Sequence, residues 1–197
     1  MMKRTAVRVV PAIALFALGV ATFVPHLKGQ NTGQPSTKNG EWPMYTADLR
    51  GSKYSPLDQI DKNNFGQLQV AWRLKTNNLG PIPDRLYSAT PLVVDGVMYL
   101  TERPNDVMAV DAKTGRVFWL YRYTPSPDAR VCCGANNRGV AMLGNTLYMG
   151  TLDAHLVAID AKTGRAVWNV AVGDPKLGYS VTMAPGFFSI VLSKSAA

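Results

Sequence analysis

The chain has 197 residues, of which 47% are hydrophobic and 17% charged, with 17 glycines and 13 prolines. This length and composition exclude a largely disordered chain and fit one globular domain with many short turns. The formal net charge is +8, but four basic residues lie within the first 29 residues, which leaves +4 for the rest. Because the remaining basic residues are scattered, no nucleic-acid partner is expected.

The N-terminal residues 1–29 have the layout of a secretory signal peptide, with a basic start followed by an apolar run at residues 9–24. This run is also close to the shortest membrane span, about 17 residues. We therefore expect a cleaved signal or a retained membrane anchor, with an ordinary buried helix as the remaining alternative, and a periplasmic protein. The polar segment 30–40 is expected to be a flexible linker, with an ordered N-terminal arm as the alternative.

An internal repeat is the strongest signal in the sequence. The segment AVDAKTGRVFW, which ends at Trp119, recurs as AIDAKTGRAVW, which ends at Trp168, 49 residues later. Each copy belongs to a unit with four strand-like runs, expected at residues 91–94, 97–100, 107–110 and 116–121, and at 139–143, 146–150, 156–159 and 165–170. Four antiparallel strands in a unit of about 40–50 residues are typical of a β-propeller blade.

The residues of the repeat have distinct expected roles. The carboxylates of Asp111 and Asp160 are expected to accept backbone N–H groups of the following turn. Gly115 and Gly164 supply the positive φ that such a turn requires. The two tryptophans are expected to lie buried between neighbouring sheets.

The predicted fold is all-β, a partial β-propeller at residues 41–185 with about three four-stranded antiparallel blades. The first of these blades is expected to be incomplete, with a strand at residues 68–74 that places Trp72 47 residues before Trp119. A generic antiparallel meander is the alternative to a propeller.

The repeated motif Ala-x-Asp-x-x-Thr-Gly-x-x-x-Trp resembles the tryptophan-docking motif of quinoprotein alcohol dehydrogenases, the methanol and ethanol dehydrogenases that use pyrroloquinoline quinone (PQQ). The adjacent cysteines Cys132 and Cys133, followed by Asn137-Arg138-Gly139, resemble the same family. The resemblance covers residues 42–185 and implies an N-terminal fragment of an eight-bladed propeller. At 49 residues per blade, a full ring needs on the order of 400 residues.

The resemblance implies four cofactor-binding residues: Cys132, Cys133, Arg138 and Thr182. In an exported chain the two cysteines are expected to form a strained disulfide that lies against PQQ, with free thiols or a soft-metal pair as alternatives. Arg138 is expected to bond the quinone oxygens, and Thr182 a PQQ carboxylate. The alternatives for these two are a surface arginine and an ordinary strand threonine.

The final segment, residues 186–197, is unlike the family and is expected to be an aberrant tail left by truncation or frameshift, or else the end of a short paralogue. The complete family enzyme oxidises an alcohol with PQQ and calcium and passes electrons to cytochrome c. No catalytic or metal-binding residue of the family is identified in this chain. We therefore expect it to bind neither group tightly and to be inactive alone. A non-catalytic propeller scaffold or outer-membrane assembly factor is the alternative function.

Overall fold

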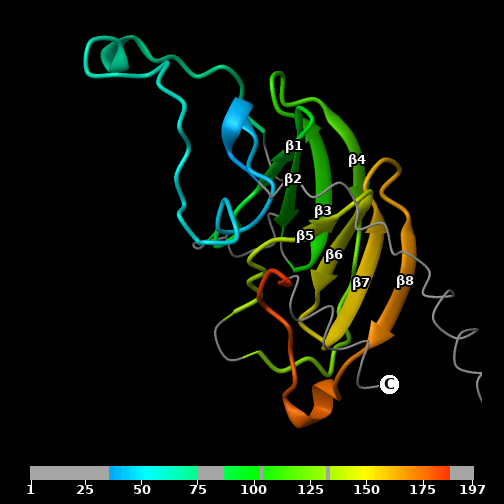
Figure 1. Ribbon diagram of the computed structural model, residues 1–197. Helices are drawn as coiled ribbons and strands as arrows, with labels where there is room; N and C mark the ends of the chain where they lie inside the picture. The colour runs from blue at the N-terminus through cyan, green and yellow to red at the C-terminus, as the bar shows by residue number, and fades with distance from the viewer. Residues whose placement is uncertain (1–35, 75–86, 103, 132–133, 187–197) are drawn as a thin grey trace, which may run out of the picture. The chain divides into compact units, whose positions relative to one another are not determined.

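The computed structural model describes residues 36–74, 87–102, 104–131 and 134–186 (Figure 1). Within them, eight strands form two four-stranded antiparallel sheets, each ordered as in the sequence. The first sheet contains β1 (Leu92–Val94), β2 (Val97–Glu102), β3 (Asp106–Asp111) and β4 (Val117–Tyr121). The second contains β5 (Ala141–Leu143), β6 (Thr146–Gly150), β7 (His155–Asp160) and β8 (Ala166–Ala171). The predicted class, a partial β-propeller of four-stranded blades, is confirmed, and so are all eight strands predicted for the two repeats.

The sequence repeat is also a repeat of strand register. In the first sheet Tyr99 pairs with Ala109, which pairs with Trp119. The second sheet has the same row 49 residues later, formed by Tyr148, Ala158 and Trp168. Each sheet has a register shift directly after the alanine of this row. The predicted equivalence of the two tryptophans is therefore confirmed.

The main hydrophobic core lies between the two sheets. It contains ten buried side chains: Leu92, Tyr99, Val107, Ala109, Val140, Leu147, Met149, Val157, Ile159 and Ala161. On β6 and β7 the residues of this cluster alternate with Tyr148 and Ala158, so one face of the second sheet packs on the first sheet. Burial of apolar surface at this interface is the main force that holds the sheets together.

The turns after β3 and β7 have the predicted chemistry. The Asp111 carboxylate accepts the backbone N–H groups of Lys113 and Thr114, at 2.9 and 2.8 Å. Asp160 accepts the equivalent two bonds at 3.1 and 2.8 Å. Gly115 and Gly164 have φ of 72° and 70°, so a side chain at either position would be strained.

Two tryptophans, Trp72 and Trp119, each pack on the turn of the sheet that follows them in the sequence. The Trp119 Nε1 atom donates to the Ala161 carbonyl oxygen at 3.0 Å, and its ring lies over Gly164, where a Cβ would come within 2.6 Å. Trp72 repeats this arrangement with the Ala112 carbonyl, at 3.2 Å, and with Gly115.

Two expectations about these tryptophans are wrong. Residues 68–74 contain no strand, although Trp72 has the docking position predicted from its spacing. Trp168 is 39% exposed rather than buried, because no further sheet covers its face within the described part of the chain.

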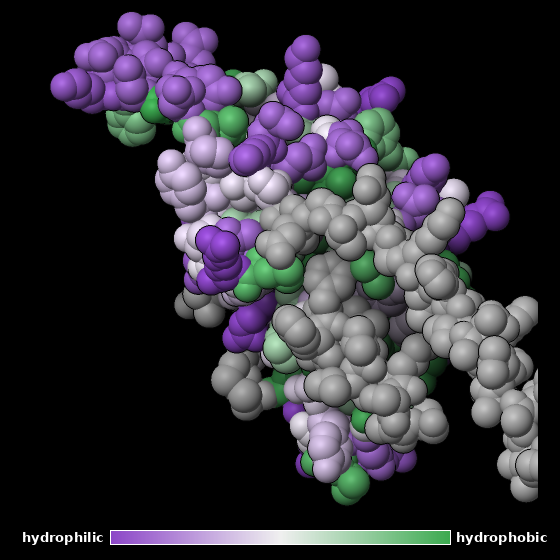
Figure 2. Space-filling view, viewed as in Figure 1, coloured by the Kyte–Doolittle hydropathy of each residue, from purple (hydrophilic) through white to green (hydrophobic). Residues whose placement is uncertain are grey.

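Outside the sheets, 3₁₀ turns occupy Lys38–Gly40, Phe65–Gln67 and Pro175–Leu177. The loop that carries the second of these is predominantly hydrophilic on the face shown in Figure 2. At the end of the expected linker, Thr37 is buried and its hydroxyl donates to the Tyr54 carbonyl oxygen at 2.7 Å. The expected signal or anchor, residues 1–29, lies outside the described residues, as does the expected tail beyond Gly186.

Candidate functional site

Three segments that are distant in the sequence meet at Arg138, just before β5. The Arg138 backbone N–H donates to the Thr182 carbonyl oxygen at 3.0 Å. On the other side, the Thr90 N–H donates to the Arg138 carbonyl oxygen at 3.3 Å. The entrances to both sheets and the segment after β8 are thus brought together by main-chain hydrogen bonds.

The structure places two of the predicted cofactor residues in direct contact. Nη1 of Arg138 donates to Oγ1 of Thr182 at 2.9 Å and lies 3.4 Å from the Thr182 carbonyl oxygen. The guanidinium is exposed, so its other N–H groups remain accessible. Cys132 and Cys133 lie outside the described residues, and their disulfide stays a prediction.

Asn137 and Gly139 fix the backbone on both sides of Arg138. The buried Asn137 side chain accepts the Gly139 N–H and donates to the Gly150 carbonyl oxygen, both at 2.8 Å. Gly139 has φ of 120°, and a Cβ there would lie 3.0 Å from the Thr90 carbonyl oxygen. Only glycine therefore fits between Arg138 and β5 without a shift of the segment that contains Thr90.

Gly150 is the point where this network meets the segment that carries Thr182. Its carbonyl also accepts a bond from the buried Asn105, whose Nδ2 lies 3.3 Å away. A Cβ on Gly150 would collide with the side chain of Val181. The Val181 N–H donates to the Thr151 carbonyl at 2.9 Å, which fixes the position of the next residue, Thr182.

A buried carboxylate, that of Asp153, anchors the segment after β4. It accepts hydrogen bonds from the Tyr123 hydroxyl at 3.0 Å, the Ser126 N–H at 2.8 Å and the Thr151 hydroxyl. Burial alone raises the Asp153 pKa, but the hydrogen bonds, with that of Thr151 the largest, outweigh burial and lower the pKa below its usual value. Asp153 is therefore a permanently charged structural anchor at neutral pH.

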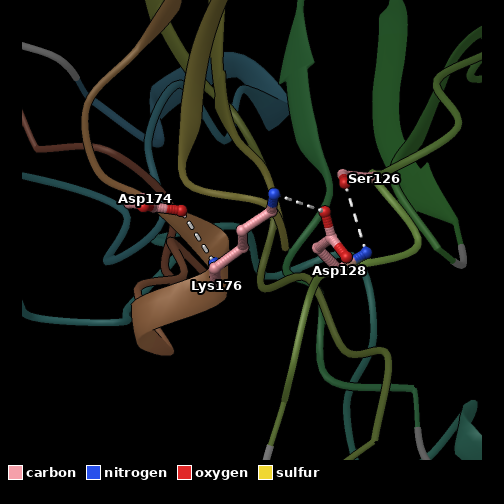
Figure 3. A network of polar contacts seen from close by, with 4 residues as sticks. All are labelled: Ser126, Asp128, Asp174 and Lys176. Carbon is pink, nitrogen blue, oxygen red and sulfur yellow. Dashed lines mark hydrogen bonds and ion pairs between the residues drawn. The ribbon is translucent and has the colours of Figure 1, made fainter.

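A weaker polar network links residues 126–128, which precede Arg138, to residues 174–176, which precede Thr182 (Figure 3). Lys176 Nζ lies 3.7 Å from Asp128 Oδ2, and the Lys176 N–H donates to Asp174 at 2.9 Å. The Asp128 N–H donates in turn to the Ser126 hydroxyl at 3.2 Å. Both charged side chains are largely exposed, so this ion pair contributes little to stability.

Sequence reasoning missed Asn105, Asn137 as an anchor, and Asp153. Asn105 and Asp153 stand in the turns before β3 and β7 and have no equivalents at the 49-residue spacing. They therefore belong to the part of the chain that differs between the two repeats. This difference was the only feature of the sequence that could have pointed to them.

The arrangement suits an oxygen-rich anion. A fixed guanidinium beside a hydroxyl offers charge-assisted donors at one exposed edge, which matches carboxylates and quinone oxygens. These donors fit the chemistry of PQQ. Among the side chains that the structure describes, no three His, Cys, Asp or Glu residues gather as a metal-binding group. No helix within the described ranges is long and apolar enough to cross a membrane.

Two sheets of four antiparallel strands, locked by tryptophan onto glycine turns, define a β-propeller of the quinoprotein class. Residues 42–172 match the family model described as "Glucose/ethanol/alcohol dehydrogenase, beta-propeller domain" of the PQQ type. The chain belongs to this family.

Relatives and solved structures agree with this assignment. The quinoprotein alcohol dehydrogenase PedH of Pseudomonas putida is 45% identical, over 70% of this chain and 22% of its own length. The quinohemoprotein alcohol dehydrogenase ADH-IIG of Pseudomonas putida is 38% identical, over 93% of this chain and 25% of its own. A europium-containing methanol dehydrogenase superposes with a TM-score of 0.67 at 33% identity, over 74% of this chain and 25% of its own. The chain thus spans about a quarter of the length of these proteins.

Proposed function

We propose that this chain forms part of the cofactor-binding side of a PQQ-dependent alcohol dehydrogenase, with Arg138 and Thr182 at the rim of the cofactor. The observation that carries the proposal is the 2.9 Å contact between these two residues, in a chain that belongs to the PQQ propeller family. The predicted Cys132–Cys133 disulfide is proposed to lie against one face of PQQ.

The described residues have clear roles in this proposal. PQQ, when bound, supplies the group that accepts the electrons of alcohol oxidation. The planar guanidinium of Arg138 offers donors to anionic oxygen, so it would hold such an oxygen and stabilise negative charge. The Thr182 hydroxyl accepts from Arg138 and keeps its own proton for a second oxygen.

For the whole enzyme we propose an alcohol as substrate, calcium as a second cofactor, and cytochrome c as electron acceptor, in the periplasm. For this chain by itself we propose no turnover. Neither Arg138 nor Thr182 can take the hydroxyl proton of an alcohol at neutral pH, and a positioned base is typically worth about 10²–10⁴-fold in rate. Dye-linked oxidation of ethanol or methanol, assayed with added PQQ and calcium, is expected not to exceed a no-protein control.

The experiment that tests the proposed function is equilibrium dialysis of PQQ against the chain. We expect weak, saturable binding that Arg138→Ala weakens by roughly 10- to 150-fold, since a charge-assisted hydrogen bond contributes about 1.5–3 kcal/mol. Arg138→Lys keeps the charge but loses the planar donor geometry, so an intermediate affinity is expected.

The matched control is Arg165→Ala, which removes another exposed arginine from the turn before β8. It lowers the net charge by the same amount and should leave PQQ binding unchanged. If Arg138→Ala and Arg165→Ala weaken binding equally, the affinity comes from net charge and Arg138 has no specific role.

A further inference from the structure

Residues 150–152, where β6 ends and the turn to β7 begins, hold the chain on both sides of the proposed cofactor rim. We call them the 150–152 turn. The Gly150 carbonyl oxygen accepts the side-chain amide of Asn137, the residue before the rim arginine, at 2.8 Å. The Thr151 carbonyl oxygen accepts the N–H of Val181, the residue before the rim threonine, at 2.9 Å. Both halves of the rim therefore depend on where this turn lies.

A buried amide from the other sheet, that of Asn105, holds the 150–152 turn at both ends. Its Nδ2 atom donates to the Gly150 carbonyl oxygen at 3.3 Å, and its Oδ1 atom accepts the Leu152 N–H at 2.9 Å. Asn105 stands in the turn between β2 and β3 of the first sheet and is 0% exposed. Hydrogen bonds buried in this way are costly to lose.

The two bonds of Asn105 act on the same peptide groups that hold the rim. The Leu152 N–H and the Thr151 carbonyl belong to one planar trans peptide group and point in opposite directions. By holding the N–H, Asn105 also sets the direction in which the carbonyl meets Val181. Its other bond goes to the Gly150 carbonyl, which Asn137 shares.

This amide is not a general part of the repeated sheet. The position 49 residues after Asn105 holds Ala154, whose side chain has no polar atom, although it is equally buried at 1% exposed. The second sheet thus forms without an equivalent amide. The bonds of Asn105 serve the place where they occur, which is the turn that holds Arg138 and Thr182.

We propose that Asn105 is a positioning residue for the cofactor. Through the 150–152 turn it sets the geometry of the Arg138 guanidinium and the Thr182 hydroxyl, which lie 2.9 Å apart. Asn105 is fully buried and acts only through these two residues. This role rests on the proposed PQQ-binding function of the rim.

Amide hydrogen exchange in the full chain, resolved to single residues, measures the positioning without PQQ. In Asn105→Ala we expect the Arg138 and Val181 N–H groups to lose protection by about tenfold or more relative to the Asp160 N–H. The Asp160 N–H donates to the Arg165 carbonyl at 2.8 Å, at the other end of β7, and serves as the internal reference. Local opening of the rim affects only the first two groups, whereas a general loss of stability affects all three.

Val107→Ala is the matched control. Val107 is fully buried on β3, two residues from Asn105, so its truncation destabilises the same sheet through a cavity. It removes no hydrogen bond to the 150–152 turn. The Arg138 and Val181 groups should therefore lose no more protection than the reference. A uniform loss in Asn105→Ala, or the same pattern in both variants, overturns the proposal.

A second variant covers the case in which Asn105→Ala does not fold. Asn105→Asp keeps the size of the side chain and an acceptor for the Leu152 N–H, but the ionised carboxylate has no donor for the Gly150 carbonyl. We expect the same selective loss of protection at Arg138 and Val181. Wild-type protection at both groups in this variant overturns the proposal.

Equilibrium dialysis of PQQ then shows whether Asn105 acts through Arg138. Asn105→Ala should weaken binding by about two- to tenfold, within the range for residues of one network. In the Arg138→Ala background, the same substitution should change the affinity by less than about twofold. An equal factor in both backgrounds indicates a purely structural role and overturns the proposal. If the wild-type chain binds no PQQ, the proposed function fails, and hydrogen exchange alone decides whether Asn105 positions the rim.

Discussion

Asn137 and Gly139 fix the backbone position of Arg138. The arginine side chain is exposed, so little packing around the side chain itself holds it. The Asn137 amide joins the Arg-Gly stretch to Gly150, and Gly139 lets the chain pass closely by Thr90. A guanidinium held in this way loses less conformational freedom when it binds an anion than one on a mobile loop. The buried amide is thus the structural support of the exposed charge.

Asn137→Ala is expected to lower the free energy of unfolding by about 1–3 kcal/mol. The substitution leaves the buried Gly139 N–H without its acceptor and removes one of the two side-chain donors to Gly150. Urea denaturation followed by circular dichroism measures the change. Asn145→Ala, an exposed asparagine in the β5–β6 turn, serves as the control and should stay within about 0.5 kcal/mol of the wild type.

Part of this site could be predicted from the sequence, and part could not. Arg138 and Thr182 were singled out by family resemblance, but 44 residues separate them and their contact depends on the strands between. The roles of Asn105 and Asp153 were not predictable, because a buried polar residue in a turn looks like any solvated one until its partners are known.

At the level of the elements, tryptophan and glycine form matched pairs across sheets. The indole needs a flat surface to lie on, and the positive φ of the glycine turn supplies a backbone with no Cβ. The indole N–H then satisfies the carbonyl directly after the turn aspartate. This explains why aspartate, glycine and tryptophan recur together in the sequence.

Gly164→Ala should expel the Trp119 ring, since the new Cβ would lie 2.6 Å from it. Gly96→Ala is the matched control: Gly96 has a similar φ of 73° but nothing within 4 Å of the added carbon. Both variants bear the backbone strain of about 1–2 kcal/mol. We expect Gly164→Ala to be about 1–3 kcal/mol less stable than the control, from overpacking, with red-shifted tryptophan emission. Equal stability of the two variants would contradict the docking role of Gly164.

The strands were predictable because their pattern repeats, and the exception is instructive. The runs at β1 to β8 are short and mostly apolar, lie between clear turn residues, and each finds a neighbour. Residues 68–74 have a similar pattern but pair with no strand in the described ranges. A β-strand is defined by its partner, so composition alone could not decide this segment.

For the molecule as a whole, acid stability depends on aspartates that stabilise turns and loops. Asp153 is the most buried of them, and its pKa is lowered in the folded state. The folded protein then binds fewer protons than the unfolded chain. The stabilisation is therefore present above the unfolded pKa, about 3.9, and is lost as the pH falls through the lower folded value.

Asp153→Asn should be less stable than the wild type at neutral pH by about 1–3 kcal/mol, because charge-assisted bonds to Thr151, Ser126 and Tyr123 are weakened. Below about pH 4 the difference should shrink as the wild-type carboxyl is protonated. Thermal unfolding between pH 7 and pH 2.5 measures both effects. The exposed Asp58→Asn is the control and should follow the wild-type curve; a constant gap for Asp153→Asn at all pH values would refute the role of its charge.

The contacts of Trp72 and Trp119 also bear on the order in which the chain can fold as it is synthesised. Each indole donates forward, from Trp72 to a carbonyl 40 residues later and from Trp119 to one 42 residues later. On a chain that emerges N-terminus first, each of these two indoles therefore appears before its acceptor. At about 5–20 residues per second this interval is roughly 2–8 s. During that interval the indole has been made but its acceptor has not, so the contact that it makes in the folded structure cannot yet form.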